Sequence, residues 1–222
     1  MGDWLMGPDE ILRHFVVALA SGELWSHIGA SLGRSLPGFA VGSALGVALG
    51  LLAGVARAID ELLSPAVFLS YPVPKIVFLP IVMVWLGIGD LSKIAIIAAA
   101  CFYPAFINAY YGARATRTIL VWSALGMGAG RWTLFWKVVV PSALPMILTG
   151  LRVALALSFI LLFAAEMVGS RSGLGWLIKQ AEQSLRFDLM WVSILTIALL
   201  GWAGDTLLRL ARARFVAWAE PR

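Results

Sequence analysis

Ionisable side chains inside long apolar segments are the residues of this sequence that could do chemistry. They are Lys75, Lys93, Arg152, Glu166 and Asp205. A charged group at bilayer depth is costly, so it marks either a path for a polar solute or a structural ion pair. Lys93, Glu166 and Asp205 lie near the ends of their segments, where they could also reach lipid headgroups. The pattern favours structural roles but identifies no partner for any of the five.

Polar groups within the apolar segments are the candidates for lining a solute pathway. They are Ser70, Tyr71, Asn108, Ser158 and Glu166. They are selected because polar side chains inside membrane spans are rare and often functional. They indicate a route for a solute and not a catalytic centre.

Patterns typical of ATP hydrolysis or metal catalysis are missing from the sequence. His14 and His27 are the only histidines, and they are not spaced as a metal-binding pair. No Gly-Lys-Ser or Gly-Lys-Thr triplet occurs, so a phosphate-binding glycine loop is excluded. Cys101 is the only cysteine, so the chain has no disulfide framework. We therefore expect no enzyme activity and no bound metal in this chain.

The composition is that of an all-α integral membrane protein. Of the 222 residues, 61% are hydrophobic and only 13% are charged. A soluble domain could not hide so much apolar surface. The apolar runs are continuous and not alternating, which predicts helices and excludes a β-barrel. Asp3, Asp9 and Glu10 occupy the region that is basic in a signal peptide, so we do not expect the N-terminus to be one.

Five segments are long and apolar enough to cross a bilayer as helices. They are residues 36–56, 66–88, 91–112, 144–168 and 189–208. The second contains Pro72, Pro74 and Pro80, so we expect it to be bent or broken. The predicted organisation is an N-terminal amphipathic, interfacial segment (1–35), a membrane domain (36–210) and a basic cytoplasmic tail (211–222).

Loop charge predicts the orientation of the chain in the membrane. One side collects Arg57, Lys75, Arg114, Arg117, Arg131, Lys137, Arg209, Arg212, Arg214 and Arg222. The other side has fewer basic residues, diluted by acidic ones. We expect the first side to be cytoplasmic, with the N-terminus outside and the C-terminus inside.

A stripe of glycines marks the first predicted span. It consists of Gly38, Gly42, Gly46, Gly50 and Gly54. This unbroken four-residue spacing places all five on one helix face, where another backbone can approach closely. The stripe predicts a partner helix, in this chain or in a second copy. Static packing and sliding of the partner helix both remain open.

The segment 113–143 joins the third and fourth spans and has the pattern of two short helices. Residues 118–127 are compatible with a helix, and Gly128 suits a turn with positive φ. A helical apolar stripe follows, made of Trp132, Phe135, Trp136, Val139 and Val140. Pro141 should limit this helix, with Ser142 capping the next one. The segment could lie flat at the interface or dock on a cytoplasmic partner.

The stretch "WSALGMGAGRWTLFWKVVVPSALP" resembles the cytoplasmic loop of permease subunits of bacterial ABC importers. Gly128 and Pro141 match the family pattern, and Ser123 and Ala124 stand for its two alanines. Trp122 stands where the family has glutamate. The stretches "SLGRSLPGFAVGSALGVALGLLAG", "YPVPKIVFLPIVMVWLGIGDLSKI" and "ILTGLRVALALSFILLFAAEMVGSRSGLGWLI" resemble the nitrate, sulfonate, taurine and bicarbonate subgroup. The similarity covers roughly residues 20 to 215.

The resemblance implies the type I ABC importer permease architecture, in the bacterial inner membrane. The implied partners are a second permease copy, two cytoplasmic ATPase subunits and a periplasmic solute-binding protein. ATP and magnesium would be bound by the ATPase, and this chain would need no cofactor. Family members often have one more N-terminal span, whereas this sequence predicts five.

The resemblance also implies a coupling role for the loop, which would contact the ATPase. The residues concerned are Trp122, Ser123, Ala124, Gly128, Arg131, Trp132, Phe135, Trp136 and Pro141. The implied substrate is a small anion or a sulfonate, with a vitamin precursor or an aromatic compound as an alternative. A secondary transporter or a channel is the alternative from another class.

Overall fold

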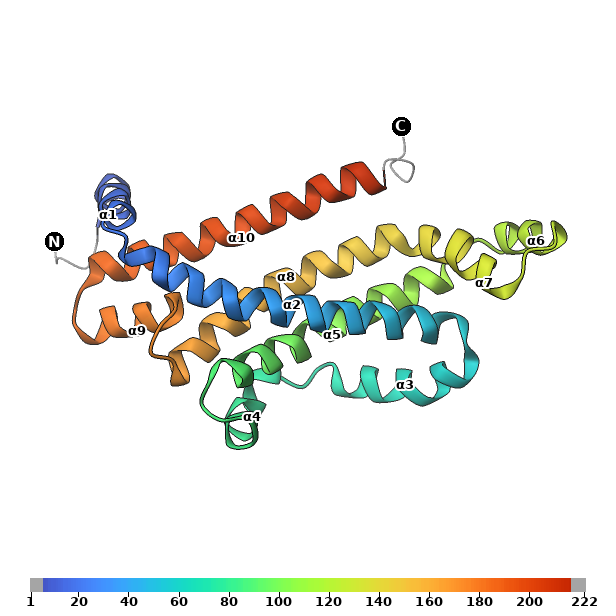
Figure 1. Ribbon diagram of the computed structural model, residues 1–222, viewed down its shortest axis with the longest axis horizontal. Coiled ribbons are helices and arrows are strands. Elements are labelled where there is room, and N and C mark those ends of the chain that lie inside the picture. Colours follow the sequence, from blue (N-terminus) through green and yellow to red (C-terminus); the bar gives the residue numbers. More distant parts are fainter. Residues whose placement is uncertain (1–5, 217–222) are drawn as a thin grey trace.

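The computed structural model describes residues 6–216, and the regular secondary structure of these residues is entirely helical (Figure 1). The elements are α1 (Pro8–Ala20), α2 (Glu23–Val55), α3 (Arg57–Ser70), η1 (Lys75–Phe78), α4 (Leu79–Leu86), α5 (Asp90–Arg114), α6 (Thr118–Gly126), α7 (Arg131–Leu134), η2 (Phe135–Val139), α8 (Val140–Gly169), α9 (Leu174–Gln183) and α10 (Phe187–Phe215). The predicted all-α fold is confirmed.

Four helical paths within the described residues are long and apolar enough to cross a membrane. They are Leu24–Val55, Asp90–Arg114, Arg131–Gly169 and Phe187–Phe215. A fifth span results if α3 is combined with η1 and α4, which are bent from it by 92°. Pro72 and Pro74 lie in this break and have no backbone N–H to continue a helix. The prediction that the second span is broken is confirmed.

The first membrane helix is longer than the sequence indicates. The predicted boundary between residues 35 and 36 falls inside α2, which begins at Glu23 and continues through Pro37. The sequence predicts a later start for this span, at residue 36, because polar residues precede Pro37. Arg34 is only 5% exposed because its guanidinium is paired inside the protein, so its charge does not end the buried helix. Of the predicted segment 1–35, only residues 6–22, with α1 and the turn after it, are described outside this helix. Their interfacial position stays a prediction.

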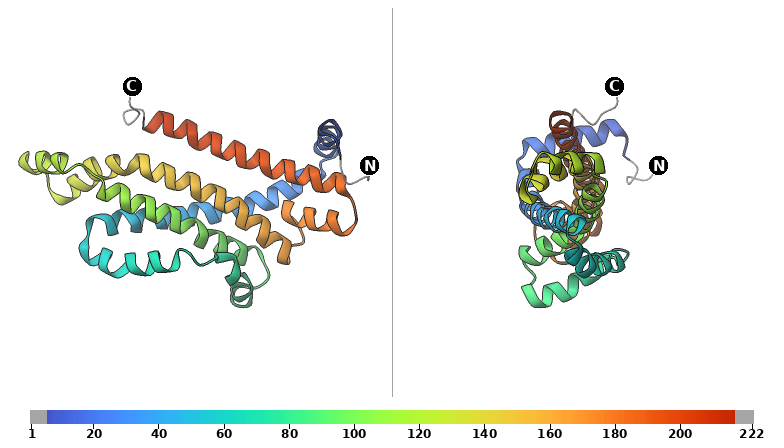
Figure 2. Two further views of the ribbon diagram at one scale, coloured as in Figure 1. Left: turned by 180° about the vertical axis from the view of Figure 1, so that it is seen from behind. Right: turned by 90° about the vertical axis from the view of Figure 1, so that its right-hand side faces the viewer.

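Helices α2, α5 and α8 form the centre of the molecule and run side by side along its length (Figures 1 and 2). The glycine stripe lies directly on α5. An added Cβ at Gly38 would lie 2.7 Å from Ile97 Cγ2, and one at Gly54 would lie 2.6 Å from the Ala113 methyl. At Gly46 an added Cβ would collide with the backbone of α5. The predicted partner helix is thus in the same chain, and the two backbones are in direct contact.

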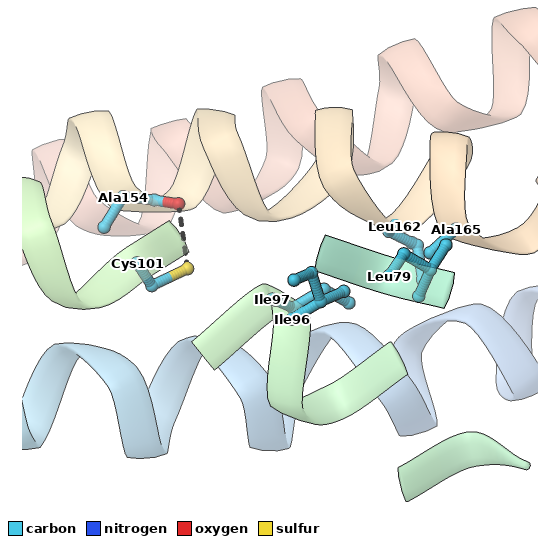
Figure 3. Packing of buried hydrophobic residues seen from close by; sticks show 7 residues of the cluster. All are labelled: Leu79, Ile96, Ile97, Cys101, Ala154, Leu162 and Ala165. Atoms are coloured by element: carbon cyan, nitrogen blue, oxygen red, sulfur yellow. Dashed lines mark hydrogen bonds between the residues drawn. The ribbon is translucent and has the colours of Figure 1, made fainter. Parts of the chain in front are cut away.

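A cluster of buried apolar side chains joins α4, α5 and α8 (Figure 3). Its members are Leu79, Ile96, Ile97, Cys101, Ala154, Leu162 and Ala165. The Cys101 thiol donates a hydrogen bond to the Ala154 carbonyl, with an Sγ–O distance of 3.3 Å. The lone cysteine therefore acts as a small buried side chain between two helices.

Helix α10 is the most peripheral of the spans. It packs beside α1 and α9 at its start (Figures 1 and 2), and in its second half Gly204 and Asp205 contact Leu155 and Arg152 of α8. Its buried residues are Val192, Ser193 and Thr196, all in its first half. The helix continues to Phe215, past the predicted boundary at residue 210. Residues 217–222 of the predicted basic tail lie outside the described residues.

Candidate functional site

The predicted loop forms one tip of the molecule, where α6 and α7 extend beyond the ends of the long helices (Figure 1). Its turn is a Schellman motif, in which Ala129 N–H bonds the Ala124 carbonyl at 3.0 Å and Gly128 N–H bonds the Leu125 carbonyl at 2.9 Å. Gly128 has a φ of 79°, which a residue with a Cβ adopts at a cost. The predicted sequence of helix, glycine turn and helix is confirmed.

Pro141 does not end the second helix of the loop, contrary to the prediction. The path from Arg131 to Gly169 is continuous, and the segment Phe135–Val139 is a π-helix. Val140 N–H bonds the Phe135 carbonyl, five residues back, in place of the usual four. The wider turn makes room for the pyrrolidine ring, whose clash with the preceding turn is what breaks a regular α-helix.

The π-helix also divides the predicted apolar stripe, which is therefore not a single face. Val139 is buried, and Phe135 and Val140 pack around it against α2, α5 and the start of α8. Trp132 and Trp136 remain exposed and contact each other edge to face, with ring centroids 5.6 Å apart. Three of the five residues anchor the loop, and two are left for another contact.

The outer surface of the loop combines exposed apolar side chains with basic ones. Trp122 is 67% exposed, Met127 81% and Trp132 75%. Between α6 and the start of α8 lies an open groove of about 760 Å³, lined in part by Arg117 and Lys137. No acidic residue occurs from 113 to 143. Large exposed apolar side chains beside positive charges are typical of a surface that binds an acidic or amphipathic partner.

Two of the predicted pathway residues meet at the break after α3. Ser70 Oγ and Tyr103 Oη are 3.1 Å apart, and the Tyr71 and Tyr103 rings are neighbours. Lys75 Nζ donates to the Ser70 carbonyl at 2.6 Å and lies 3.9 Å from the centre of the Tyr103 ring. The charge count had grouped Lys75 with the cytoplasmic loops, but the lysine lies at the break within the bent span.

Glu166 is fully buried and belongs to a polar network near the end of α8. This end of α8 lies opposite the loop (Figure 1). Its carboxylate accepts from Arg34 Nη1 at 2.7 Å, from Ser31 Oγ at 2.9 Å and from Gly175 N–H at 2.8 Å. Arg34 also pairs with Asp90, with an Nε–Oδ1 distance of 2.6 Å. The network ties together α2, α5, α8 and α9. In this arrangement Glu166 faces other protein groups and not an open cavity.

The remaining pathway candidates do not join either group. Ser158 is buried, donates to the Leu155 carbonyl at 2.7 Å and lies 3.3 Å from the Ser35 hydroxyl. Asn108 donates to the Pro104 carbonyl of its own helix at 2.9 Å. The structure therefore separates the five candidates into the Ser70–Tyr71 break, the buried Glu166 network and two isolated polar groups.

Residues 29–33 spell Gly-x-Ser-x-Gly, the pattern of a hydrolase nucleophile elbow. The structural context excludes that function, because Ser31 lies inside α2 and is fully buried. Its hydroxyl donates to Glu166 and accepts from Leu174 N–H at 2.9 Å. Ser31 thus belongs to the buried network, a role that sequence spacing alone does not indicate.

The other ionisable groups have structural partners. Arg152 forms a bidentate ion pair with Asp205, and one of its two contacts is an Nη2–Oδ2 distance of 3.1 Å. The pair joins α8 to α10. Lys93 is 1% exposed and donates to the Gly89 and Gly169 carbonyls, so it caps the end of α8 and does not reach headgroups. The predicted structural role is confirmed for both cations, with partners that the sequence did not identify.

Comparison with known proteins gives one consistent family. Residues 42–217 match the family described as "Binding-protein-dependent transport system inner membrane component". The taurine transport system permease protein TauC of Escherichia coli K12 is 33% identical over 97% of this chain and 80% of its own length. The aliphatic sulfonates transport permease protein SsuC of the same organism is 36% identical over 96% of this chain and 81% of its own length.

A solved structure has the same fold. It is an inward-facing conformation of the MetNI methionine ABC transporter, with a TM-score of 0.64. The similarity covers 97% of this chain and 100% of that chain at 20% sequence identity. The expected permease architecture is confirmed by this likeness.

Proposed function

From the premise that the chain belongs to the family of binding-protein-dependent transport system inner membrane components, we propose that it provides the membrane pathway for a small sulfonate. The chain is the multi-pass inner membrane permease of an ABC importer. ATP hydrolysis takes place in a separate subunit. Relatives named for taurine and for aliphatic sulfonates support the substrate class.

The exposed aromatic tip at α6 and α7 is the observation that carries the mechanism. The loop would dock on the ATPase through Trp122, Ser123, Ala124, Gly128, Arg131, Trp132, Phe135, Trp136 and Pro141. Trp122 and Trp132 are exposed, and Met127 lines the groove together with Arg117 and Lys137. Phe135 and Val139 hold the loop to the membrane helices. Because the segment has no carboxylate, the contact rests on apolar burial and on attraction to acidic groups of the ATPase.

Movement of the ATPase would reach the membrane through the continuous helix that begins at Arg131. The loop is anchored by Val139 against α2 and α5, so displacement of the tip acts on the start of α8. An element that two sites share can couple them if its position differs between their states. This route is a structural hypothesis about how hydrolysis opens and closes the pathway.

The proposed assembly contains two copies of this chain, two ATPase subunits and a periplasmic binding protein. Family membership implies the ATPase and the binding protein. The homodimer is our inference from this chain's resemblance to single-permease importers. ATP and magnesium would bind only to the ATPase. Arg57, Arg114 and Arg117 lie at the loop end, which we propose is cytoplasmic, with the N-terminus outside and the C-terminus inside.

A paired loop variant tests the docking. Gly128→Pro with Trp132→Asp should abolish co-purification of the ATPase, because it removes the Schellman turn and adds a charge to the exposed face. Glu61→Gln is a matched control, since Glu61 is a surface residue whose pairing with Arg57 is exposed. Full ATPase assembly and transport-coupled hydrolysis in the loop variant would disprove the docking role.

Reconstitution distinguishes an importer from a secondary transporter or a channel. The chain alone in proteoliposomes should not move labelled taurine down an ion gradient. Addition of the ATPase, ATP and the cognate binding protein should produce uptake and stimulated hydrolysis. Gradient-driven uptake by the chain alone would overturn the proposal.

A further inference from the structure

The break between α3 and η1 places a lysine ammonium at the end of a helix. Lys75 Nζ donates to the carbonyls of Ser70, Tyr71 and Val73 at 2.6, 3.1 and 2.8 Å. These carbonyls lack the usual helical partners, because α3 ends at Ser70 and two prolines follow. The lysine therefore stabilises the broken end of the span.

This positive charge has no anionic partner. Among the described residues, no carboxylate lies within 4.0 Å of Lys75 Nζ. Carbonyl dipoles and the Tyr103 ring stabilise the ammonium but carry no net charge. Arg34, Arg114 and Arg152, by contrast, each pair with an aspartate or a glutamate. Lys93 also donates only to carbonyls, but it is fully buried, whereas Lys75 is only partly buried. A partly buried cation within a span is a candidate for a functional role.

Lys75 lines a cavity of about 280 Å³ between the break, α5 and α8. Lys75 and Tyr103 line it together with Ala100, Leu157 and Leu161, which are apolar. The volume lies just below the range of about 300–1,000 Å³ for drug-sized ligands, which suits a smaller molecule. One charged group beside an apolar wall fits a molecule with a compact anionic head and a short aliphatic part.

We propose that this cavity binds the sulfonate head of the transported solute, with Lys75 as the group that attracts it. The site rests on the proposed function, since it gives the sulfonate a position within the membrane pathway. A sulfonate oxygen can replace the carbonyl of Val73, whose side chain is exposed, while the other two carbonyls keep the ammonium in place. The aliphatic part would lie against Leu157 and Leu161.

Binding of ethanesulfonate to the permease–ATPase complex in lipid nanodiscs tests the site. Lys75→Gln should weaken binding at least about tenfold, whereas Lys75→Arg keeps the charge and should change it less than about threefold. Methyl ethyl sulfone, an uncharged analogue, should bind no better to the wild type than to Lys75→Gln. Lys179→Gln is the matched control, because Lys179 also caps a carbonyl, that of Met167 at 2.8 Å, but lies outside this cavity.

The outcomes separate the site from the proposed function. Unchanged ethanesulfonate binding in Lys75→Gln, or no binding by the wild type, would overturn the site. Equal weakening in Lys179→Gln would also overturn it, since the loss would then come from a general effect on the fold. ATPase co-purification and hydrolysis stimulated by the binding protein report the importer function independently. If the ATPase did not co-purify or was not stimulated, but ethanesulfonate binding still depended on Lys75, the importer function would be contradicted and the site would be supported.

Discussion

The two ends of this permease differ in how far their side chains are buried and paired. At the end near α9, Arg34 and Glu166 are almost completely buried and paired with each other. At the other end, Trp122 and Trp132 are mostly exposed and have no partner in α2, α5 or α8 that buries them. The first end is complete within one chain, whereas the second has the composition of an interface without its other half.

On the proposed function, this difference separates the residues that stabilise the chain from those that would contact another subunit. Substitutions in the buried network should act on the stability of the chain. Substitutions at the loop tip should act on assembly and leave stability unchanged. The predictions below follow this distinction from the largest expected effect to the smallest.

Loss of the buried carboxylate should be the most destabilising change. Glu166→Gln leaves Arg34 and Lys93 buried with only the exposed Asp90 to balance them. Breaking a buried pair by removing one partner costs about 3–5 kcal/mol. Thermal unfolding in detergent measures the loss, with the exposed Glu61→Gln as the control. Equal stability of the two variants would contradict the contrast between the ends.

A branched side chain in the glycine stripe should separate the two central helices between those ends. Gly46→Val would direct its side chain at the backbone of α5 and should cost about 3 kcal/mol through overpacking. Gly33→Ala on the same helix meets open space and should be neutral or stabilising by up to about 1 kcal/mol. Melting temperatures of both variants test the direct contact of α2 with α5. Similar destabilisation by both would contradict it.

Removal of the exposed indoles should affect assembly alone. Trp122→Ala with Trp132→Ala should change the stability of the permease by less than about 0.5 kcal/mol, as for other surface substitutions. Affinity for the ATPase should fall by about 2 kcal/mol or more if these residues are interface anchors. Co-purification at graded detergent and salt, beside a melting curve, measures both quantities. A large loss of stability would show that the tip belongs to the core of the fold.

Loss of the α8–α10 ion pair should have the smallest effect. Arg152→Gln removes a pair whose arginine side chain is 56% exposed, and Asp205 keeps Arg209 at 3.2 Å. Exposed pairs contribute about 0–1 kcal/mol. Melting temperature at low and high salt tests this, because a screened pair loses its contribution as salt rises. An effect as large as that of Glu166→Gln would mean that the pair is effectively buried.

Local sequence features are sufficient to predict the broken second span and the turn of the loop. The broken second span follows from Pro72 and Pro74, whereas Pro80 lies in the first turn of α4. The turn at Gly128 follows from a glycine between two helical stretches. These features are local, so neighbouring residues contain the necessary information. The glycine stripe indicates a close helix contact for the same reason, although it does not identify α5 as the partner.

The features that the sequence could not predict depend on distant or irregular contacts. Arg34 and Glu166 are 132 residues apart, and nothing in their spacing indicates a pair. The π-helix before Pro141 changes the hydrogen-bond spacing from four to five residues. The predicted apolar stripe of the loop assumes α-helical spacing, so its residues lie on two different faces. Lys75 and Tyr103 meet only because the chain turns by 92° between α3 and α4.

The unbroken path from Arg131 to Gly169 also has a mechanical consequence. Its 39 residues make a rod of almost 60 Å at about 1.5 Å per residue, roughly twice the thickness of the hydrocarbon core. Trp132 lies at one end of this rod and Glu166 near the other. If the helix pivots at the Glu166 network, a tilt of the helix by about 5° moves the loop tip by about 5 Å. This displacement is close to the rise of one helical turn. With the tip docked on the ATPase as proposed, the helix would be a lever arm that converts a large displacement at the ATPase into a small rotation at the far face of the membrane.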